Sequence, residues 1–178
     1  KTLQMRLIWS KEKSVKINFD NKLIKTFVDN LPFKLTNAQR KAAFEILKDL
    51  EKSKPMNRLL NGDVGSGKTI VAAIASLQTI NVGYQVAIMA PTEVLARQHF
   101  ITLTKLFKNY EINIALLTNS YQLINQISNK LQTTNYKKTN RSNLLEEIKN
   151  GNVNLIIGTH ALIQKDVNFK NLALIIID

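Results

Sequence analysis

Short runs of apolar residues recur along this 178-residue chain, and most of them are followed by a segment with helical periodicity. Short apolar runs bounded by polar or turn residues are typical of strands that are buried on both faces of a sheet. The pattern therefore predicts strands at five places: NRLL (57–60), YQVAIMA (84–90), INIALLT (112–118), NVNLIIGT (152–159) and LALIIID (172–178).

The segments between these runs repeat their apolar residues with the period of an α-helix. In residues 36–53, for example, the apolar positions 42, 43, 46, 47 and 50 fall on one helix face. Strands that alternate with helices predict parallel βαβ units, and hence a three-layer α/β fold with a mostly parallel sheet and helices on both faces. Further helices are predicted for residues 68–81, from Thr92 to about Lys108, and for SNLLEEIKN (142–150), which Ser142 begins and Gly151 follows.

Two stretches depart from this alternation. Residues 1–30 hold two short amphipathic patterns, in KTLQMRLIWSKEK (1–13) and in LIKTFVDNLPF (23–33), where Pro32 should end the helix. We interpret residues 1–30 as a lead-in to a main domain at residues 31–178. Residues 121–141 are polar and rich in Asn, Lys and Thr, which predicts a mobile surface insertion.

A glycine-rich turn separates the strand predicted at 57–60 from the helix predicted at 68–81. It fits G-x-x-x-x-G-K-[ST], in which glycines let several backbone N–H groups point at one phosphate group and a helix N-terminus adds its dipole. The lysine can reach the outer phosphates and the threonine hydroxyl can ligate Mg²⁺. An ordinary glycine-rich loop is the alternative, but the flanking strand and helix favour phosphate binding. The residues of this predicted P-loop are Gly62, Asp63, Val64, Gly65, Ser66, Gly67, Lys68 and Thr69.

Composition narrows the class of protein. Apolar residues make up 44% of the chain, which predicts a soluble globular domain, and no apolar run is long enough to span a membrane. The absence of cysteine excludes disulfides and thiol chemistry and agrees with a cytoplasmic protein. A net charge of +12 fits a nucleic-acid partner, but the many Lys, Asn and Ile residues equally fit an AT-rich genome.

Two further side chains could complete a nucleotide site. Asp178 ends the apolar run 172–178, as in the Walker B pattern, where an acid at the carboxyl end of a parallel strand holds Mg²⁺, here through water. Gln39 has two interpretations. Thr36-x-x-Gln39 is a capping-box pattern, and spacing alone favours that role, whereas a glutamine could also read adenine through paired hydrogen bonds.

Two threonines follow predicted strands and begin predicted helices. Thr92 in APTEVLARQH and Thr159 in GTHALIQ each place a hydroxyl at a helix start, which suits a phosphate of a nucleic-acid backbone. A threonine N-cap is also an ordinary helix start. His99 and His160 are interpreted as helix-start or packing residues, because no third ligand is spaced to form a metal site with them.

These motifs together resemble a known family. LPFKLTNAQRKAAFEILKDL, PMNRLLNGDVGSGKT, APTEVLARQH, GTHALIQ and LALIIID are similar, in that order, to the first RecA-like motor domain of RecG-type DNA helicases. Those enzymes are superfamily 2 ATP-dependent translocases that rewind and regress stalled replication forks. The resemblance spans roughly residues 31–178.

The resemblance implies a role for each motif. Gln39 would read adenine, residues 62–69 would bind ATP, Thr92 and Thr159 would contact a DNA strand, and Asp178 would be the first acid of the D-E-x-H box. It also implies a fold that is incomplete at its C-terminal end, a second RecA-like domain and a wedge domain as partners, and no ATP turnover by these residues alone. The family has Gly in place of Asn119 and a shorter connector after Ser120.

Two rival functions stay open from the sequence. The motor of the transcription-repair coupling factor is the nearest relative of this family, and it differs in the APTEVLA and GTHALIQ motifs. A nucleotide-binding module that binds DNA without catalysis is the other. Flanking sequence would separate these, since an acid and a histidine after Asp178 and a preceding OB-fold wedge are marks of the RecG type.

Overall fold

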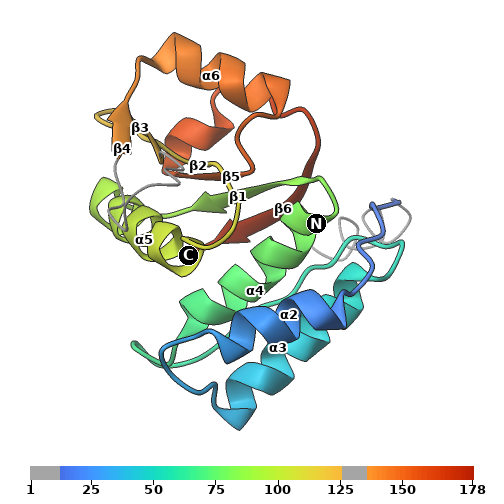
Figure 1. Ribbon diagram of the computed structural model, residues 1–178. Helices are drawn as coiled ribbons and strands as arrows, with labels where there is room; N and C mark the ends of the chain where they lie inside the picture. The colour runs from blue at the N-terminus through green and yellow to red at the C-terminus, as the bar shows by residue number, and fades with distance from the viewer. Residues whose placement is uncertain (1–12, 126–135) are drawn as a thin grey trace, which may run out of the picture. The chain divides into compact units, whose positions relative to one another are not determined.

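The computed structural model describes residues 13–125 and 136–178 (Figure 1). The chain divides into two compact units, Lys1–Val82 and Gly83–Asp178, which are described separately here. The helix predicted for residues 1–13 falls almost entirely outside the described residues, and the predicted boundary near residue 30 stays a prediction.

The described part of the first unit, residues 13–82, contains three helices, α2 (Asn21–Asp29), α3 (Asn37–Leu50) and α4 (Lys68–Asn81). The α4 helix is buried on almost every side, as its apolar sequence requires. Its one long polar side chain in the core, Gln78, accepts a hydrogen bond from the Asp20 N–H and donates one to the Asn18 carbonyl. These bonds tie the chain entering α2 to α4. The helices predicted at 36–53 and 68–81 are confirmed, and α2 ends before Pro32 as expected.

The strand predicted at residues 57–60 is wrong. This stretch has no regular secondary structure and no strand pairing in the described part of the chain, and Leu59 is 90% exposed. An apolar run becomes a strand only where a neighbouring strand pairs with its backbone groups. The segment is instead held to α3 by Arg58, whose guanidinium contacts Glu45 at 2.7 Å and Asp49 at 2.6 Å.

The second unit is a six-stranded sheet in the order β4-β3-β2-β5-β1-β6. The β1, β2, β5 and β6 strands are parallel to one another, whereas β3 and β4 are antiparallel to their neighbours. The mostly parallel α/β fold is therefore confirmed. In chain order the elements are β1 (Gln85–Met89), α5 (Glu93–Leu106), β2 (Ile114–Leu117), β3 (Gln122–Asn125), β4 (Tyr136–Lys138), α6 (Arg141–Asn150), β5 (Leu155–Gly158), the 3₁₀ turn η1 (His160–Ile163) and β6 (Leu172–Ile177).

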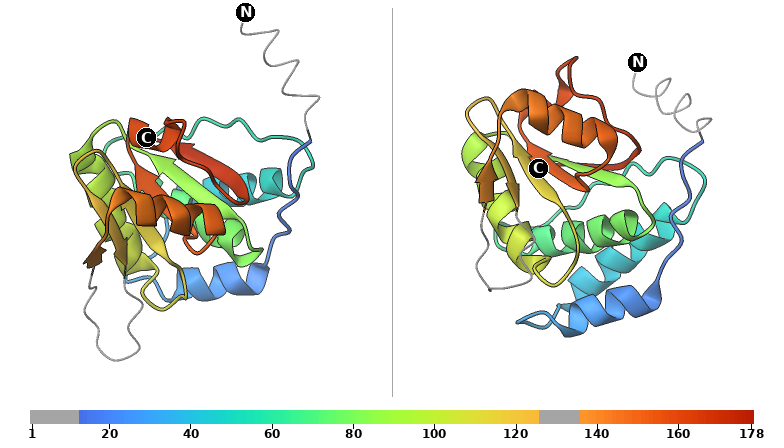
Figure 2. Two further views of the ribbon diagram at one scale, coloured as in Figure 1. Left: turned by 90° about the horizontal axis from the view of Figure 1, so that it is seen from above. Right: turned by 45° about the horizontal axis from the view of Figure 1, so that its top comes forward.

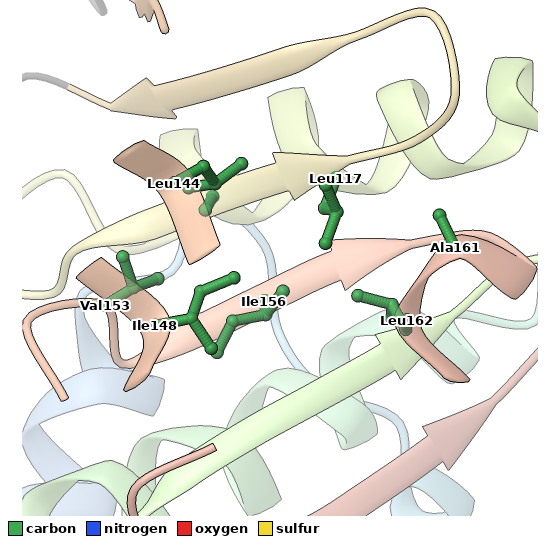
Figure 3. Packing of buried hydrophobic residues seen from close by; sticks show 8 residues of the cluster. Leu117, Leu144, Ile148, Val153, Ile156, Ala161 and Leu162 are labelled. Atoms are coloured by element: carbon green, nitrogen blue, oxygen red, sulfur yellow. The ribbon is translucent and has the colours of Figure 1, made fainter. Parts of the chain in front are cut away.

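Successive side chains of the central strands point to opposite faces of this sheet. One helix lies on each of these two faces (Figures 1 and 2). On one face, Leu117 of β2 and Ile156 of β5 pack with Leu144 and Ile148 of α6, and Figure 3 shows this cluster. On the other face lies α5, with Phe100 fully buried. This layering brings the carboxyl ends of β1, β5 and β6 to one edge of the sheet.

The stretch 121–141 differs from its prediction. Its described parts form β3 and β4, which extend the sheet as an antiparallel pair rather than a loose insertion. Helix α6 begins one residue earlier than predicted, and Asn140 rather than Ser142 is its N-cap, because the Asn140 carboxamide oxygen accepts from the Asn143 N–H. Gly151 ends α6 in the left-handed conformation, as predicted.

The last strand also differs from its prediction. The apolar run 172–178 does form β6 beside β1, but Ile175 and Ile177 are 61% and 69% exposed. In the described part of the chain β6 is an edge strand, so only some of its side chains are covered.

Candidate functional site

The backbone of the glycine-rich turn is shaped by two of its glycines. Gly65 and Gly67 have φ of 80° and 81°, a left-handed conformation that side chains disfavour, and Gly67 leads directly into α4. The Lys68 ammonium donates to the carbonyl oxygens of Gly62 at 2.7 Å and Asp63 at 2.9 Å. The lysine is therefore held over the loop at the N-terminus of a 14-residue helix, where a triphosphate would meet its charge and the helix dipole together.

Gln39 connects this loop to the start of α3. Its side-chain oxygen accepts from the Thr36 N–H at 2.9 Å, and the Thr36 hydroxyl accepts from the Gln39 N–H at 3.2 Å, so the predicted capping box is confirmed. Its amide nitrogen also donates to the Ser66 carbonyl at 2.8 Å. A Cβ at position 67 would lie too close to that nitrogen and would displace the Gln39 amide, while the left-handed φ of Gly67 is what favours glycine there.

The other predicted site residues lie in the second unit, each after a parallel strand. Thr92 follows β1, Thr159 follows β5 and Asp178 follows β6, and these three strands are neighbours. Thr92 is the N-cap of α5, since its hydroxyl accepts from the Leu95 N–H at 3.3 Å. Thr159 is different: its hydroxyl makes no cap hydrogen bond, and a single 3₁₀ turn follows in place of the predicted helix. The prediction of two equivalent caps is wrong, because the chain leaves η1 after four residues.

A close backbone contact, which the sequence does not show, explains why glycine occupies position 158, just before Thr159. A Cβ at this position would collide with the backbone carbonyl of Leu117 in the adjacent strand β2. The glycine therefore lets β5 approach β2 closely at the edge of the sheet where Thr159 lies.

Asp178 has a partner that sequence spacing could not reveal. Its Oδ2 lies 2.8 Å from Nε2 of His99 on α5, and its backbone N–H donates to the Met89 carbonyl of β1. His99, for which the sequence predicts a helix-start or packing role, lies in the second turn of α5 and contacts Asp178, the predicted Walker B acid. No group of three metal-ligating side chains exists within the described residues.

Glu93 provides a second link between motifs that sequence analysis missed. From the first turn of α5, its carboxylate accepts a hydrogen bond from the Ser120 N–H at 3.0 Å. Hydrogen bonds from the Ser120 backbone and side chain hold the pKa of the Glu93 carboxyl below its ordinary value. The turn itself is closed by Thr118, whose N–H donates to the Tyr121 carbonyl and whose hydroxyl accepts from the Tyr121 N–H. The turn 118–121 is thus fixed to the N-terminus of α5.

The motifs that the two units carry are, in sequence, those of a nucleotide-dependent helicase domain. Residues 36–178 match the family model for DEAD/DEAH box helicases, and the chain belongs to that family. Family membership implies that ATP is used.

Within this family the chain is similar to RecG. It is 49% identical over 168 residues to the ATP-dependent DNA helicase RecG of Aquifex aeolicus, an alignment that covers 94% of this chain and 19% of the relative. The corresponding protein of Thermotoga maritima is 46% identical over 159 residues, covering 89% of this chain and 18% of the relative. A solved structure of RecG bound to a three-way DNA junction superposes with a TM-score of 0.81 at 40% identity, over 97% of this chain and 22% of that one.

These matches confirm the RecG-type resemblance and the RecA-like fold. The chain spans about a fifth of the length of these relatives. No helix among the described residues is long and apolar enough to cross a membrane.

Proposed function

We propose that this chain is the ATP-binding part of a motor that moves along branched DNA and remodels stalled replication forks during recombinational repair. The observation that carries the proposal is the contact between Gln39 and the phosphate-binding loop. It joins a residue suited to adenine and a loop suited to phosphates in a single nucleotide-binding element. The relatives that support the DNA substrate are helicases named RecG, one of them in complex with a three-way junction.

Each residue has a role in this proposal. Lys68 and the α4 N-terminus bind the triphosphate, residues 62–67 wrap around it, and Gln39 selects adenine. Thr92 and Thr159, at the carboxyl edge of the sheet, donate to phosphates of a DNA strand.

Each unit offers one oxygen ligand of the kind that Mg²⁺ prefers. The Thr69 hydroxyl lies in the first turn of α4, and Asp178 keeps one carboxylate oxygen beyond the one that His99 contacts. Hard oxygen ligands of this kind are those that Mg²⁺ prefers, and the ion would neutralise phosphate charge when bound. Arginines of a second RecA-like domain and a wedge domain that holds the junction would be the partners of this unit, in the cytoplasm.

The test uses the full-length polypeptide that carries these residues. ATP hydrolysis should be stimulated more by a three-way junction than by linear duplex of equal length, and the junction should be unwound. Lys68→Ala should abolish both activities, because loss of one partner of a desolvated charge pair costs about 2–5 kcal/mol. Lys41→Ala, which changes an exposed lysine on α3, is the matched control. Binding of ATP and DNA without any turnover would instead establish the non-catalytic module.

A further inference from the structure

The β3–β4 pair is a part of the second unit that contains none of the predicted site residues. It extends the sheet beyond β2. No Asp or Glu occurs between Glu111 and Glu146, a stretch that carries four Lys or Arg residues. Such a bias suits a polyanionic partner.

Contacts with α5 show which side chains of this pair share one face. The rings of Tyr136 and Phe100 lie 5.1 Å apart, and the Arg97 guanidinium lies 5.6 Å from the centre of the Tyr121 ring. Tyr121 and Tyr136 therefore both face the α5 side. Lys138 lies two residues after Tyr136, so it shares that face, whereas Lys137 points to the other.

The strand register independently places Lys138 on the α5 side of the sheet and Lys137 on the opposite side. Lys137 is paired with Ile124, which packs against the α6 cluster on the opposite face of the sheet. Lys138 is paired with Leu123, and directly opposed residues of an antiparallel pair share a face. We call the four residues on the α5 side, Arg97, Tyr121, Tyr136 and Lys138, the hairpin strip.

The chemistry of the hairpin strip is that of a phosphate-contacting surface. Arg97 and Lys138 are exposed, and neither forms an ion pair within the described part of the chain, whereas Arg141 nearby in sequence is neutralised by Asp166 at 3.0 Å. Tyr121 and Tyr136 are 39% and 37% exposed, and each carries a hydroxyl group that can act as a hydrogen-bond donor. The nearest acid on α5, Glu93, has its carboxylate directed at the Ser120 N–H.

We propose that the hairpin strip binds the phosphate backbone of a DNA strand, as a sequence-independent contact additional to those of Thr92 and Thr159. The strip begins at the turn 118–121, which Glu93 fixes beside the N-terminus of α5, so it continues from the edge of the sheet that carries those threonines. Cations with tyrosine hydroxyls are side chains that position a nucleic-acid backbone without reading its bases. This inference rests on the proposed function.

The alternative role for lysines on an edge strand is to prevent pairing with another sheet edge. That role requires charge but no particular face, so Lys137 and Lys138 would serve it equally. DNA binding by the strip requires Lys138 and not Lys137.

The experiment measures the affinity of the full-length polypeptide for a three-way DNA junction against salt concentration. Arg97→Ala and Lys138→Gln should each make the log–log slope shallower by about 0.9, which is about an eightfold loss of affinity at 0.1 M salt. Lys137→Gln is the matched control and should leave the slope unchanged. Tyr136→Phe, which retains the ring beside Phe100, should weaken binding without lowering the melting temperature.

The outcomes are distinguishable from failure of the proposed function. If the junction still binds and stimulates ATPase activity but slopes are unchanged in the Arg97 and Lys138 variants, the strip is refuted while the motor is retained. If Lys137→Gln and Lys138→Gln changed the salt dependence of DNA binding equally, or if both variants self-associated, the role of the lysines would be to prevent pairing with another sheet edge. Polyglutamate serves as a polyanion without phosphate groups. If the Arg97 and Lys138 variants lost affinity for polyglutamate but not for DNA, the inference would also be overturned.

Discussion

The side-chain amide of Gln39 donates to the backbone carbonyl of Ser66 at 2.8 Å while its oxygen caps α3. One side chain therefore fixes the start of one helix and the loop that begins another. The two interpretations of Gln39, as a capping residue and as a reader of adenine, are compatible in this geometry, since the amide retains a second N–H and a second oxygen lone pair.

Substitution of Gln39 can separate these roles. Gln39→Ala should remove the hydrogen bond to the Thr36 N–H and the loop contact, lowering stability by about 1 kcal/mol and reducing the preference for ATP over GTP. Gln39→Glu keeps an acceptor for the Thr36 N–H but cannot donate to Ser66, so it should melt near the wild type and still lose the preference. The added negative charge should weaken the binding of ATP and GTP alike. The ratio of the affinities for ATP and GTP is therefore the decisive measurement. An unchanged ratio in both variants would leave Gln39 as a capping residue alone.

His99 should act by positioning Asp178. In His99→Ala the carboxylate loses its 2.8 Å contact and becomes free to rotate. We expect kcat for ATP hydrolysis to fall and the Mg²⁺ concentration for half-maximal activity to rise, with the KM for ATP little changed. His99→Gln, which can still donate to the carboxylate, should recover part of the loss. Equal losses in both variants, accompanied by a lower melting temperature, would show that the histidine only packs.

The link between Glu93 and Ser120 should depend on pH. The folded-state pKa of Glu93 is lowered, so the link is intact above the ordinary glutamate pKa and is lost only as pH falls through the lower folded value. The Ser120 amide resonance should therefore titrate below the ordinary glutamate range. In Glu93→Gln the amide oxygen still accepts, and that titration should vanish. A Ser120 amide that titrates at the ordinary glutamate pKa would contradict the link.

Thr92 and Thr159 should contribute to DNA binding without sequence preference. Their replacement by Ala should weaken binding about equally across DNA sequences, because hydroxyl–phosphate contacts carry no base information. The two substitutions should differ in their effect on stability. Thr92→Ala also removes an N-cap, which contributes about 1 kcal/mol, whereas the Thr159 hydroxyl makes no cap hydrogen bond. Affinity for several unrelated sequences and melting temperature should be measured for both variants. A loss confined to one sequence would indicate contacts to bases.

Local patterns predicted those parts of the fold that local chemistry determines. The helix start at Lys68 follows from a glycine whose φ of 81° ends the loop, and the buried strands β1, β2 and β5 follow from continuous apolar runs. The strand β4 could not be predicted, since the three exposed residues Tyr136–Lys138 have no apolar pattern and depend on their partner β3. The contact between His99 and Asp178 joins residues 79 positions apart, and no spacing rule identifies such a pair.

The 178 residues expressed alone should neither melt cooperatively nor hydrolyse ATP at a DNA-stimulated rate. The outer edge of β6 has no partner strand in the described part of the chain, Ile175 and Ile177 are mostly exposed beside it, and the segment entering the phosphate-binding loop forms no strand. Unpaired strand edges with exposed apolar side chains favour association over a defined folded state.

Catalysis faces a separate obstacle in the chain alone. The resemblance implies arginines from a second motor domain, which in such enzymes contribute about 10³–10⁵ in rate, and this chain spans about a fifth of the RecG relatives. Calorimetry and phosphate release, with and without a three-way junction, test both expectations. We expect a broad transition, and a rate that DNA does not raise. A sharp transition together with DNA-stimulated turnover would show that these residues form a complete motor, and that the exposed edge of β6 is tolerated in the active fold.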